Sequence, residues 1–584
     1  MYFQSALVIS LGLLALPHTA SFIIPSQTPL GTSTDAETCP LAAKVPPPND
    51  GFTSGLKFVK DAHIRAQQVE RLSRAVQVPT TVNDYLTDPY DPGFAPFLEF
   101  HSLLEQLFPL THATAHLSHV NRLGLVYTLN GTSAAKPLLF TAHQDVVPIV
   151  NAADWTHPPF AGHFDGEWLW GRGASDCKNV LIGLLSVVED LLAQGWTPTR
   201  TVVLAFGFDE ESHGWLGAGS IAAYLEETFG ADGDAFEFVL DEGGMGLEVL
   251  SSPSSSSSSS SPATTDVVYA LPGVSEKGSL DLTLELRVAG GHSSVPPAHT
   301  GIGMMAEIIY TLERAELFRP RLDASHPAYR KLQCQVAHSP DAVEPWLARA
   351  LAGGDDAETL AERLAVSRGA ATRFTLQTSQ AADLISGGVK SNALPETVSA
   401  LVNYRVALHQ TPDEVQARAV RLIAPIAERY NLTLVAFPEE EKEEEETGLR
   451  IPGDNDGHAA NTLVLSTLSE PLRPAPVSPT DLESETWARF AGVTRAVFES
   501  VPSLQGKTVV VAGDIMTGNT DTRFYWNLSR NIYRWSPSRQ GGALNIHTVD
   551  ERVAIDVHLE AMMLYYDLIR AFDGAGQTEI EHDL

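Results

Sequence analysis

Short, nearly continuous apolar runs recur through the first half of the chain. Three of them, at residues 138–142, 201–208 and 236–240, have the length and composition of buried strands, and the apolar stretch 180–192, closed by Gly195, predicts a helix between them. Strands without a polar face are typical of a parallel sheet that helices cover on both sides. This half of the chain is therefore predicted to form an α/β domain.

A different pattern begins at residue 280, where leucine and valine occupy every second position as far as residue 288 and polar residues stand between them. This is the period of a strand in a sheet with one solvated face. Residues 398–406 look like its partner strand and are predicted to pair with it. The change of pattern predicts a smaller α+β domain at residues 278–437, inserted into the α/β domain.

The insertion divides the α/β domain into two parts. The first part is expected at residues 27–277, and the second at residues 455–584, ending in a helix at 551–572. Two low-complexity stretches punctuate the chain, a serine-rich stretch at 251–265 and an acidic stretch at 438–454. Because neither can bury an apolar face, both are predicted to be exposed loops rather than binding sites.

The N-terminal residues 1–26 contain one apolar run, at residues 6–16, with no Lys or Arg before it. The run is short for a membrane span, so a secretory signal peptide is favoured and a short signal anchor is the alternative. Asn-x-Ser/Thr sequons at Asn130, Asn431 and Asn527 also fit a secretory route. The protein would contact a membrane only if the N-terminal segment were an uncleaved anchor.

Composition narrows the possible functions. Hydrophobic residues make up 43% of the chain and charged residues 19%, as in a globular protein, and 39 Lys and Arg against 72 Asp and Glu give a net charge of −33. This balance argues against a nucleic-acid binder. Three cysteines are too few for a disulfide framework and lack the spacing of a Cys-based zinc site. A bound metal would therefore rest on His and carboxylate ligands.

Each predicted strand of the α/β domain ends in residues that can bind a metal. The first runs into His143 and Asp145, the second into the acidic residues 209–211 and the third into the acidic residues 241–242, while Asp176 precedes the helix. The carboxyl ends of parallel strands share one edge of the sheet, so these groups are expected to converge on one cleft. Several carboxylates in one place are costly unless a cation neutralises them, and zinc suits such ligands.

Six short strings of residues occur in order along the chain, at 143–148, 171–176, 209–211, 241–244, 387–396 and 517–523. Together they resemble the co-catalytic zinc exopeptidases that include carboxypeptidase G and aminoacylase. Within that family they look most like the fungal vacuolar carboxypeptidase S branch, the Gly-Xaa carboxypeptidases, and its animal relatives that hydrolyse N-acyl amino acids. The resemblance implies a zinc-exopeptidase catalytic domain with a mostly parallel mixed sheet, and an inserted α+β lid or dimerisation domain.

The resemblance also implies a set of metal ligands. His143 and Asp241 would hold one zinc ion and Glu211 and His547 a second. Asp176 would bridge the two ions, together with a water molecule. A helix-capping role is the alternative for His547.

Other residues of the site take their expected roles from the same resemblance. Asp145 would orient His143, and Glu210 would act as the general base. His292, in the lid, would stabilise the oxyanion, in dimeric relatives from the partner subunit; a plain turn histidine is the alternative. Cys177 is interpreted as a small packed residue rather than a nucleophile.

Substrate-binding residues are expected in the lid and near the last string. Asn392 and Arg405 resemble lid residues that bind the substrate, with Arg405 on its free carboxylate, because a guanidinium offers two parallel donors. Gly518 belongs to the string that would also contact the substrate. Arg523 is a second candidate for the carboxylate, and a structural salt bridge is an equal alternative for it.

The resemblance therefore implies a metallocarboxypeptidase with two Zn²⁺ per chain that releases a C-terminal amino acid from small peptides of the Gly-Xaa type. The first alternative is an N-fatty-acyl amino acid amidohydrolase that uses the same site. The second is an inactive metal-binding protein, which has little support because Glu210 and every expected ligand are present. The vacuole is the expected location, with an extracellular protein as the alternative, and the lid is a possible homodimer contact.

Overall fold

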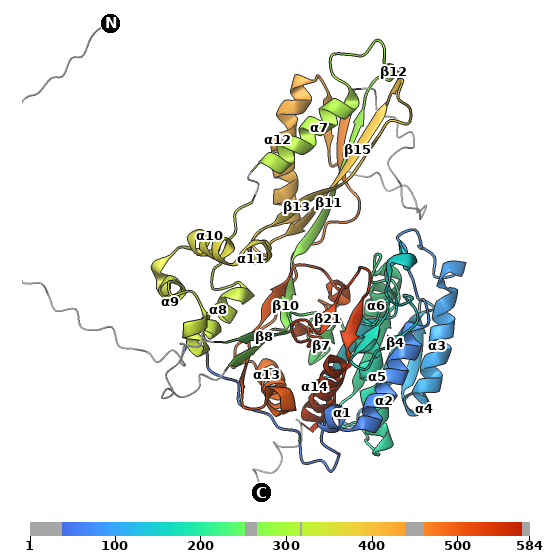
Figure 1. Cartoon of the computed structure of the whole chain (residues 1–584), viewed down its shortest axis with the longest axis vertical. Helices are drawn as coiled ribbons and strands as arrows, with labels where there is room; N and C mark the ends of the chain where they lie inside the picture. Colours follow the sequence, from blue (N-terminus) through green and yellow to red (C-terminus); the bar gives the residue numbers. More distant parts are fainter. Residues whose placement is uncertain (1–37, 252–265, 316–317, 439–460, 575–584) are drawn as a thin grey trace, which may run out of the picture.

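The computed structural model (Figure 1) describes residues 38–251, 266–315, 318–438 and 461–574. The expected leader and almost all of the serine-rich and acidic loops lie outside the described residues. Within the described ranges, every helix is too short or too polar to cross a membrane.

An eight-stranded mixed sheet forms the centre of the α/β domain. The strands β6, β3, β7 and β20 run parallel to one another, and the flanking strands β1, β2 and β10 run antiparallel to their inner neighbours. The predicted buried strands are observed as β3, β6 and β7, so the predicted fold class is confirmed. In sheet order the strands are β1 (His116–Val120), β2 (Gly124–Leu129), β6 (Val202–Gly207), β3 (Leu138–His143), β7 (Phe238–Asp241), β20 (Ile532–Arg534), β10 (Gly273–Glu276) and β19 (Asp514–Met516).

Helices cover both faces of this sheet, which explains why its strands have no polar face. Along β3, Leu138 and Phe140 pack into the core with α5 and α14, whereas Leu139 packs on the opposite side with residues of α6. The helix α14 begins four residues later than predicted, because residues 552–554 form the strand β22. The helices are α1 (Lys57–Lys60), α2 (Ala62–Val76), α3 (Ala95–Leu107), α4 (Pro109–Thr114), α5 (Lys178–Ala193), α6 (Ser220–Phe229), α13 (Glu485–Ser500) and α14 (Ile555–Asp573).

Two small sheets extend the domain. One carries the loop before α5 and the C-terminal segment, and the other lies beside β10 and α13. Their strands are β21 (Ala543–Leu544), β22 (Arg552–Ala554), β5 (Trp168–Trp170) and β4 (His163–Phe164), then β18 (Thr508–Val511), β9 (Val267–Ala270) and β8 (Leu247–Leu250).

A five-stranded sheet with two helices forms most of the segment expected to be a lid, and it is seen above the α/β domain in Figure 1; we call this unit the lid. The alternating leucines of β11 pair in antiparallel register with β15, as at Leu282 and Val402, and their side chains pack against α7 and α12. The strand β17 also belongs to this sheet, although the expected boundary assigned it to the second part of the α/β domain. The elements are β13 (Ser379–Gly387), β15 (Thr397–Val406), β11 (Gly278–Arg287), β17 (Thr462–Thr467), β16 (Thr433–Ala436), α7 (Gly301–Arg314) and α12 (Pro412–Arg429), with a separate pair β12 (Gly291–His292) and β14 (Ala393–Leu394).

Four short helices between α7 and β13 form a unit with its own small core, which we call the helical insertion. A disulfide joins Cys334 on α8 to Cys39, near the start of the described chain. The two cysteines are 295 residues apart, so their spacing in the sequence gave no sign of this bond. The helices are α8 (Pro327–His338), α9 (Leu347–Arg349), α10 (Ala357–Arg368) and α11 (Ala370–Leu376).

Candidate metal centre

Asp176 joins two histidines that are distant in the sequence. Its Oδ1 lies 3.1 Å from Nε2 of His143, at the end of β3, and its Oδ2 lies 3.0 Å from Nε2 of His547. The same nitrogen of His547 is 2.9 Å from Oε2 of Glu211. His547 stands before α14 begins and faces carboxylates, so it does not cap that helix. One carboxylate thus connects two groups of ligand atoms.

Neighbouring carboxylates hold the ligand residues in place. The backbone N–H of Glu211 donates to Oδ2 of Asp145 at 2.9 Å, and Nδ1 of His143 lies 3.0 Å from the Asp145 carbonyl oxygen. Asp209 accepts from the N–H groups of Leu216 and Gly217, at 2.9 and 2.7 Å. The segment 209–211 is therefore fixed at both ends, and Asp145 orients the ring of His143.

Glu551 likewise holds the loop of Asp176 in place. Its buried carboxylate accepts from the N–H groups of Gly173, Ser175 and Asp176 at 2.9 to 3.2 Å, and Arg172 pairs with it at 2.6 Å. The loop before α5 is thus folded around one acid. This role of Glu551 was not predicted, because no pattern in the sequence connects it to a loop so far away.

We expect Glu551→Gln to lower the free energy of unfolding by about 3 to 5 kcal/mol, because it leaves the buried Arg172 charge and backbone donors without a matched acceptor. Chemical denaturation measures this change. Asp550→Asn is the control, since among the described residues the Asp550 carboxylate accepts only from the exposed Thr156, from its N–H and its hydroxyl group, both at 2.7 Å. Equal effects of the two substitutions would contradict the assigned role.

The two acidic residues at the end of β7, Asp241 and Glu242, are not placed as expected. Glu242 joins His143, Asp176 and Cys177 in a group whose ligand atoms all lie within 4.8 Å of one another. Asp241 is outside that group, buried, with Oδ2 lacking a hydrogen-bond partner among the described residues. The geometry therefore favours Glu242 over Asp241 as the ligand beside His143.

Burial and mutual repulsion disfavour charge on Glu210 and Glu211, whereas hydrogen bonds to His143 and His547 lower the pKa of Asp176. Burial, followed by the Asp176 carboxylate, raises the pKa of Glu211 to about 7. Burial also raises the pKa of Glu210 well above its usual value, and neighbouring carboxylates add to this. Hydrogen bonds to Asp176 and Glu211 raise the pKa of His547 to about 10, so in the metal-free protein a protonated histidine supplies the positive charge. A metal ion would take over that role and release the proton.

Cys177 is fully buried at the edge of the apolar core, where its sulfur also accepts from the N–H of His143 at 3.2 Å. Burial raises the pKa of its thiol well above the usual value, so it stays protonated. This environment agrees with the interpretation of Cys177 as a packing residue.

The lid residues His292 and Asn392 lie apart from the metal-ligand group. His292 is exposed on β12, at the far end of the lid in Figure 1, and its Nδ1 is 2.7 Å from Ser294 Oγ. The carbonyl oxygen of Asn392 accepts from the N–H of Ser293, so the two residues share this end of the lid. Within one chain, the structure does not bring them to Asp176.

Arg405 lies near the junction of the lid and the α/β domain. Its Nη1 donates to Oδ1 of Asn519 at 2.7 Å, and Nδ2 of Asn519 donates to the Lys277 carbonyl oxygen at 2.6 Å. The exposed Gly518 precedes Asn519. Arg523 instead donates to the carbonyl oxygen of His213, a contact that fixes the loop after β6. The two arginines are thus held differently, Arg405 by a side-chain amide and Arg523 by a backbone carbonyl group.

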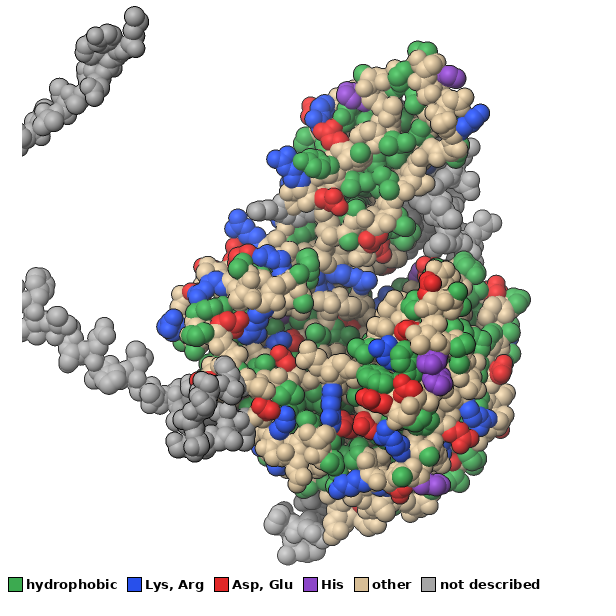
Figure 2. All heavy atoms as spheres, viewed as in Figure 1, with side chains coloured by type: hydrophobic (Ala, Val, Ile, Leu, Met, Phe, Trp, Pro, Cys, Tyr) green, Lys and Arg blue, Asp and Glu red, His purple; other side chains and the backbone are tan. Residues whose placement is uncertain are grey.

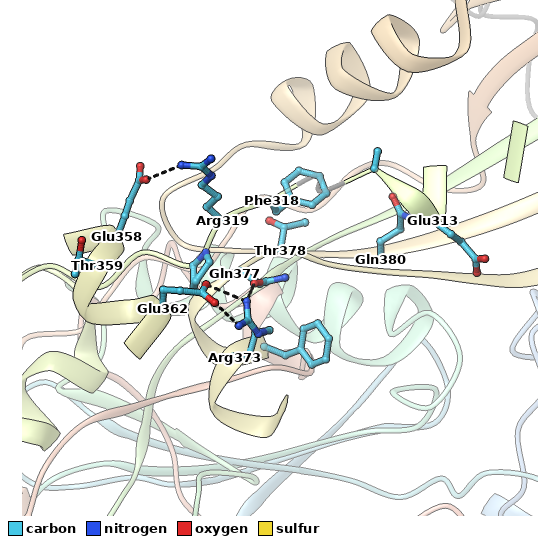
Figure 3. A pocket seen from close by; sticks show the side chains of 13 residues that line it. Glu313, Phe318, Arg319, Glu358, Thr359, Glu362, Arg373, Gln377, Thr378 and Gln380 are labelled. Atoms are coloured by element: carbon cyan, nitrogen blue, oxygen red, sulfur yellow. Dashed lines mark hydrogen bonds and ion pairs between the residues drawn. The ribbon is translucent and has the colours of Figure 1, made fainter. Parts of the chain in front are cut away.

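A pocket of about 600 Å³ lies where the lid meets the helical insertion (Figure 3). Four of its charged residues form ion pairs, Arg373 with Glu362 at 2.6 Å and Arg319 with Glu358 at 3.6 Å. No predicted metal or substrate residue lines it. The predicted metal ligands lie elsewhere, in the group around Asp176.

Comparisons with known proteins find a family and several relatives that this chain resembles. The model of Peptidase family M20/M25/M40 matches residues 139–571. Carboxypeptidase S of Saccharomyces cerevisiae is 37% identical over 542 residues, covering 91% of this chain and 88% of the yeast protein. Human N-fatty-acyl-amino acid synthase/hydrolase PM20D1 is 28% identical, covering 89% of this chain and 90% of the human protein.

Solved structures share the fold at much lower identity. The di-peptidase Dug1p of Saccharomyces cerevisiae has a TM-score of 0.59 at 12% identity, covering 89% of this chain and 98% of that one. Human carnosine dipeptidase 1 has a TM-score of 0.55 at 13% identity, covering 90% and 100%. The family match over most of the chain and the identity to the yeast protein show that this chain belongs to peptidase family M20/M25/M40 and is a hydrolase.

Proposed function

We propose that the protein is a metallocarboxypeptidase that uses two zinc ions to release a C-terminal amino acid from small peptides. The observation that carries the proposal is Asp176, whose two oxygens each lie about 3 Å from the histidine of a different ligand group. Imidazole and carboxylate ligands suit zinc. The similarity to carboxypeptidase S supports the same reaction.

The proposed ligands are His143 and Glu242 for one ion and Glu211 and His547 for the other, with Asp176 shared. Asp241, the ligand implied by the resemblance, is then the buried residue that precedes Glu242 in the chain. Each ion would receive three protein ligands and keep a position for water or substrate, as catalytic zinc sites do.

Two zinc ions held there would polarise the scissile carbonyl group and lower the pKa of the attacking water. Glu210 accepts the proton of that water and delivers it to the leaving nitrogen. Burial raises the pKa of Glu210 above the usual range of a carboxyl group, the direction that favours uptake of a proton. Asp145 keeps His143 in one orientation throughout.

Arg405 is proposed to bind the free carboxylate of the substrate. The interaction is worth about 1.5 to 3 kcal/mol, so we expect Arg405→Ala to lower catalytic efficiency on a free dipeptide by roughly ten- to over a hundredfold, with little effect on its C-terminal amide. Steady-state kinetics on both substrates measure the ratio.

Arg523→Ala is the matched control for this experiment, because Arg523 bonds a backbone carbonyl group. A preference for the free carboxylate that survives Arg405→Ala but disappears in Arg523→Ala would move the role to Arg523. Metal content is checked in both variants.

The second candidate function is hydrolysis of N-fatty-acyl amino acids at the same site. The similarity to the human protein named as a synthase and hydrolase of such compounds supports it. A hydrolysis screen of the zinc-loaded protein against Gly-Leu, longer peptides and fatty-acyl amino acids separates the two. We expect Gly-Leu to be preferred; a clear preference for fatty-acyl substrates would establish the second function instead.

We also propose that the protein forms a homodimer through the lid. The strand β13 is at the edge of the described sheet, and its Leu384 and Ile385 are 65% and 60% exposed, with Ile302 and Tyr310 exposed on α7. Figure 2 shows hydrophobic side chains grouped over this part of the molecule. An unpaired apolar edge favours association, and a partner could bring His292 to a site that its own chain does not reach.

The proposed location is the secretory pathway, with the vacuole as destination. The disulfide between Cys39 and Cys334 supports an oxidising compartment. The sequon residues Asn130, Asn431 and Asn527 are all exposed, as glycosylation would require.

A further inference from the structure

A second pocket, of about 130 Å³, adjoins the metal-ligand group. Asp176 and Glu242 both line it, and so does Ile546, which directly precedes His547 in the chain. A group held in this pocket would therefore lie beside the proposed metal ions. The mechanism above assigns the pocket no role.

One part of the pocket wall is apolar and comes from the C-terminal segment. Val553 lies on β22, Val557 and Ala561 lie one turn apart on α14, and Ala543 and Ile546 precede them in the chain. Val553, Val557 and Ala561 are at most 8% exposed and pack in the main core of the α/β domain. Because closely packed core side chains have little freedom to move apart, this wall can select an occupant by its size.

The rest of the wall offers little charge to an occupant. Apart from Asp176 and Glu242, His558 is the only titratable residue among the described residues that line the pocket. Burial lowers the pKa of His558 to about 4, so its ring is neutral. The hydroxyl group of Ser536 accepts from the N–H of Gly243 at 3.0 Å and donates to its carbonyl oxygen at 3.2 Å, so it is already bonded. With the two carboxylates engaged by metal, the pocket favours an uncharged occupant.

The volume of the pocket restricts that occupant to a small group. An apolar cavity of roughly 150 Å³ holds one benzene molecule. A pocket of about 130 Å³ thus has room for a short aliphatic group, such as the side chain of a leucine. A long fatty acyl chain would not fit inside it.

The domain that forms the wall indicates which part of the substrate would enter. All residues of the wall belong to the α/β domain, whereas Arg405, proposed to bind the free carboxylate of the released residue, lies on β15 of the lid. At the metal ions, the scissile bond has the acyl group on one side and the released residue on the other. Because the released residue is directed to the lid, the acyl group is left to the α/β domain.

We propose that this pocket binds the side chain on the acyl side of the scissile bond and limits it to a short aliphatic group. Dipeptides that begin with Gly, Ala, Val or Leu are then the substrate class, and long-chain fatty-acyl amino acids are excluded from the pocket. This inference rests on the proposed function, because the pocket can select substrates only if the adjoining metal centre cleaves them.

Filling the pocket tests the inference. Ala561→Leu places a larger side chain in the wall, and we expect it to lower the ratio of catalytic efficiency on Leu-Leu to that on Gly-Leu by about ten- to two-hundredfold, since small changes of fit in an apolar pocket have effects of this size. Ala571→Leu is the matched control, because Ala571 is on the same helix but does not line the pocket, and its ratio should equal that of the wild type. Val557→Ala enlarges the pocket and should instead raise the ratio of Phe-Leu to Leu-Leu. Thermal unfolding confirms that each variant folds, and Val557→Ala decides the question if Ala561→Leu does not fold.

Calorimetry is the second measurement, and it does not depend on turnover. Isocaproate, which is leucine without its amino group, carries a carboxylate for the metal ions and a branched tail for the pocket. It should bind more tightly than acetate to the zinc-loaded wild type and to Ala571→Leu. In Ala561→Leu this advantage over acetate should disappear.

Unchanged substrate ratios in the folded variants would overturn the inference, and so would an equal change in Ala571→Leu. An altered preference for the released residue, compared on Leu-Gly and Leu-Leu, would overturn the assignment to the acyl side. A wild type that binds no zinc and cleaves no dipeptide would overturn the proposed function instead. In that case tighter binding of isocaproate than of acetate would still support the pocket as an aliphatic site, and equal binding would overturn it as well.

Discussion

Replacing Glu210 by Gln is expected to lower turnover by roughly a hundredfold to ten-thousandfold while both zinc ions stay bound. The amide keeps the size of the side chain but cannot accept the proton of the attacking water, and general base catalysis has an effect of this order. Glu210 is not one of the residues whose ligand atoms gather around Asp176, so its loss should leave the metal centre intact.

Glu211→Gln is the matched variant, because Glu211 is next in the chain but lies 2.9 Å from Nε2 of His547 within the ligand group. We expect it to weaken zinc retention, measured by elemental analysis after dialysis. Equal zinc contents in the two variants would show that Glu210 and Glu211 do not have the separate roles of general base and metal ligand.

Replacing His292 by Ala is expected to lower turnover about a hundred- to a thousandfold, the usual effect of losing one oxyanion donor. Zinc content should not change, because His292 is exposed on the lid and outside the ligand group. Steady-state kinetics and elemental analysis on the purified variant measure the two quantities.

If the protein is a dimer as proposed, this variant should also complement Glu210→Gln. In a mixed dimer with Glu210→Gln, one site combines an intact Glu210 with an intact His292 from the partner, so mixing the two inactive proteins should restore part of the activity. No recovery in verified mixed dimers would mean that His292 serves its own chain or none. A monomer in solution would contradict the dimer itself.

Much of the fold follows from patterns in the sequence. The buried strands and the alternating strands β11 and β15 are observed within a few residues of their predicted ends, because continuous and alternating apolar patterns reflect burial on two faces or one. The helical insertion was not predicted. Its helices are short and its small core is separate from the lid core, so its pattern does not distinguish it from the surrounding α+β domain.

The site was predictable to the level of strand ends, but not to the level of side-chain direction. Placing Asp241 and Glu242 at the end of a strand needs only the sequence. Deciding which of them reaches His143 depends on where β7 stops, at Asp241, and on which way the next residue turns. Glu551 could not be predicted, because its partners lie in a loop some 375 residues earlier.

Zinc content during titration, followed together with release of leucine from Gly-Leu, tests the central claim most directly. We predict two ions per chain at saturation, with activity that chelation abolishes and added zinc restores. We expect that number because Asp176 belongs to two groups of ligand atoms. Saturation at one ion per chain, or undiminished hydrolysis after complete removal of metal, would contradict the account.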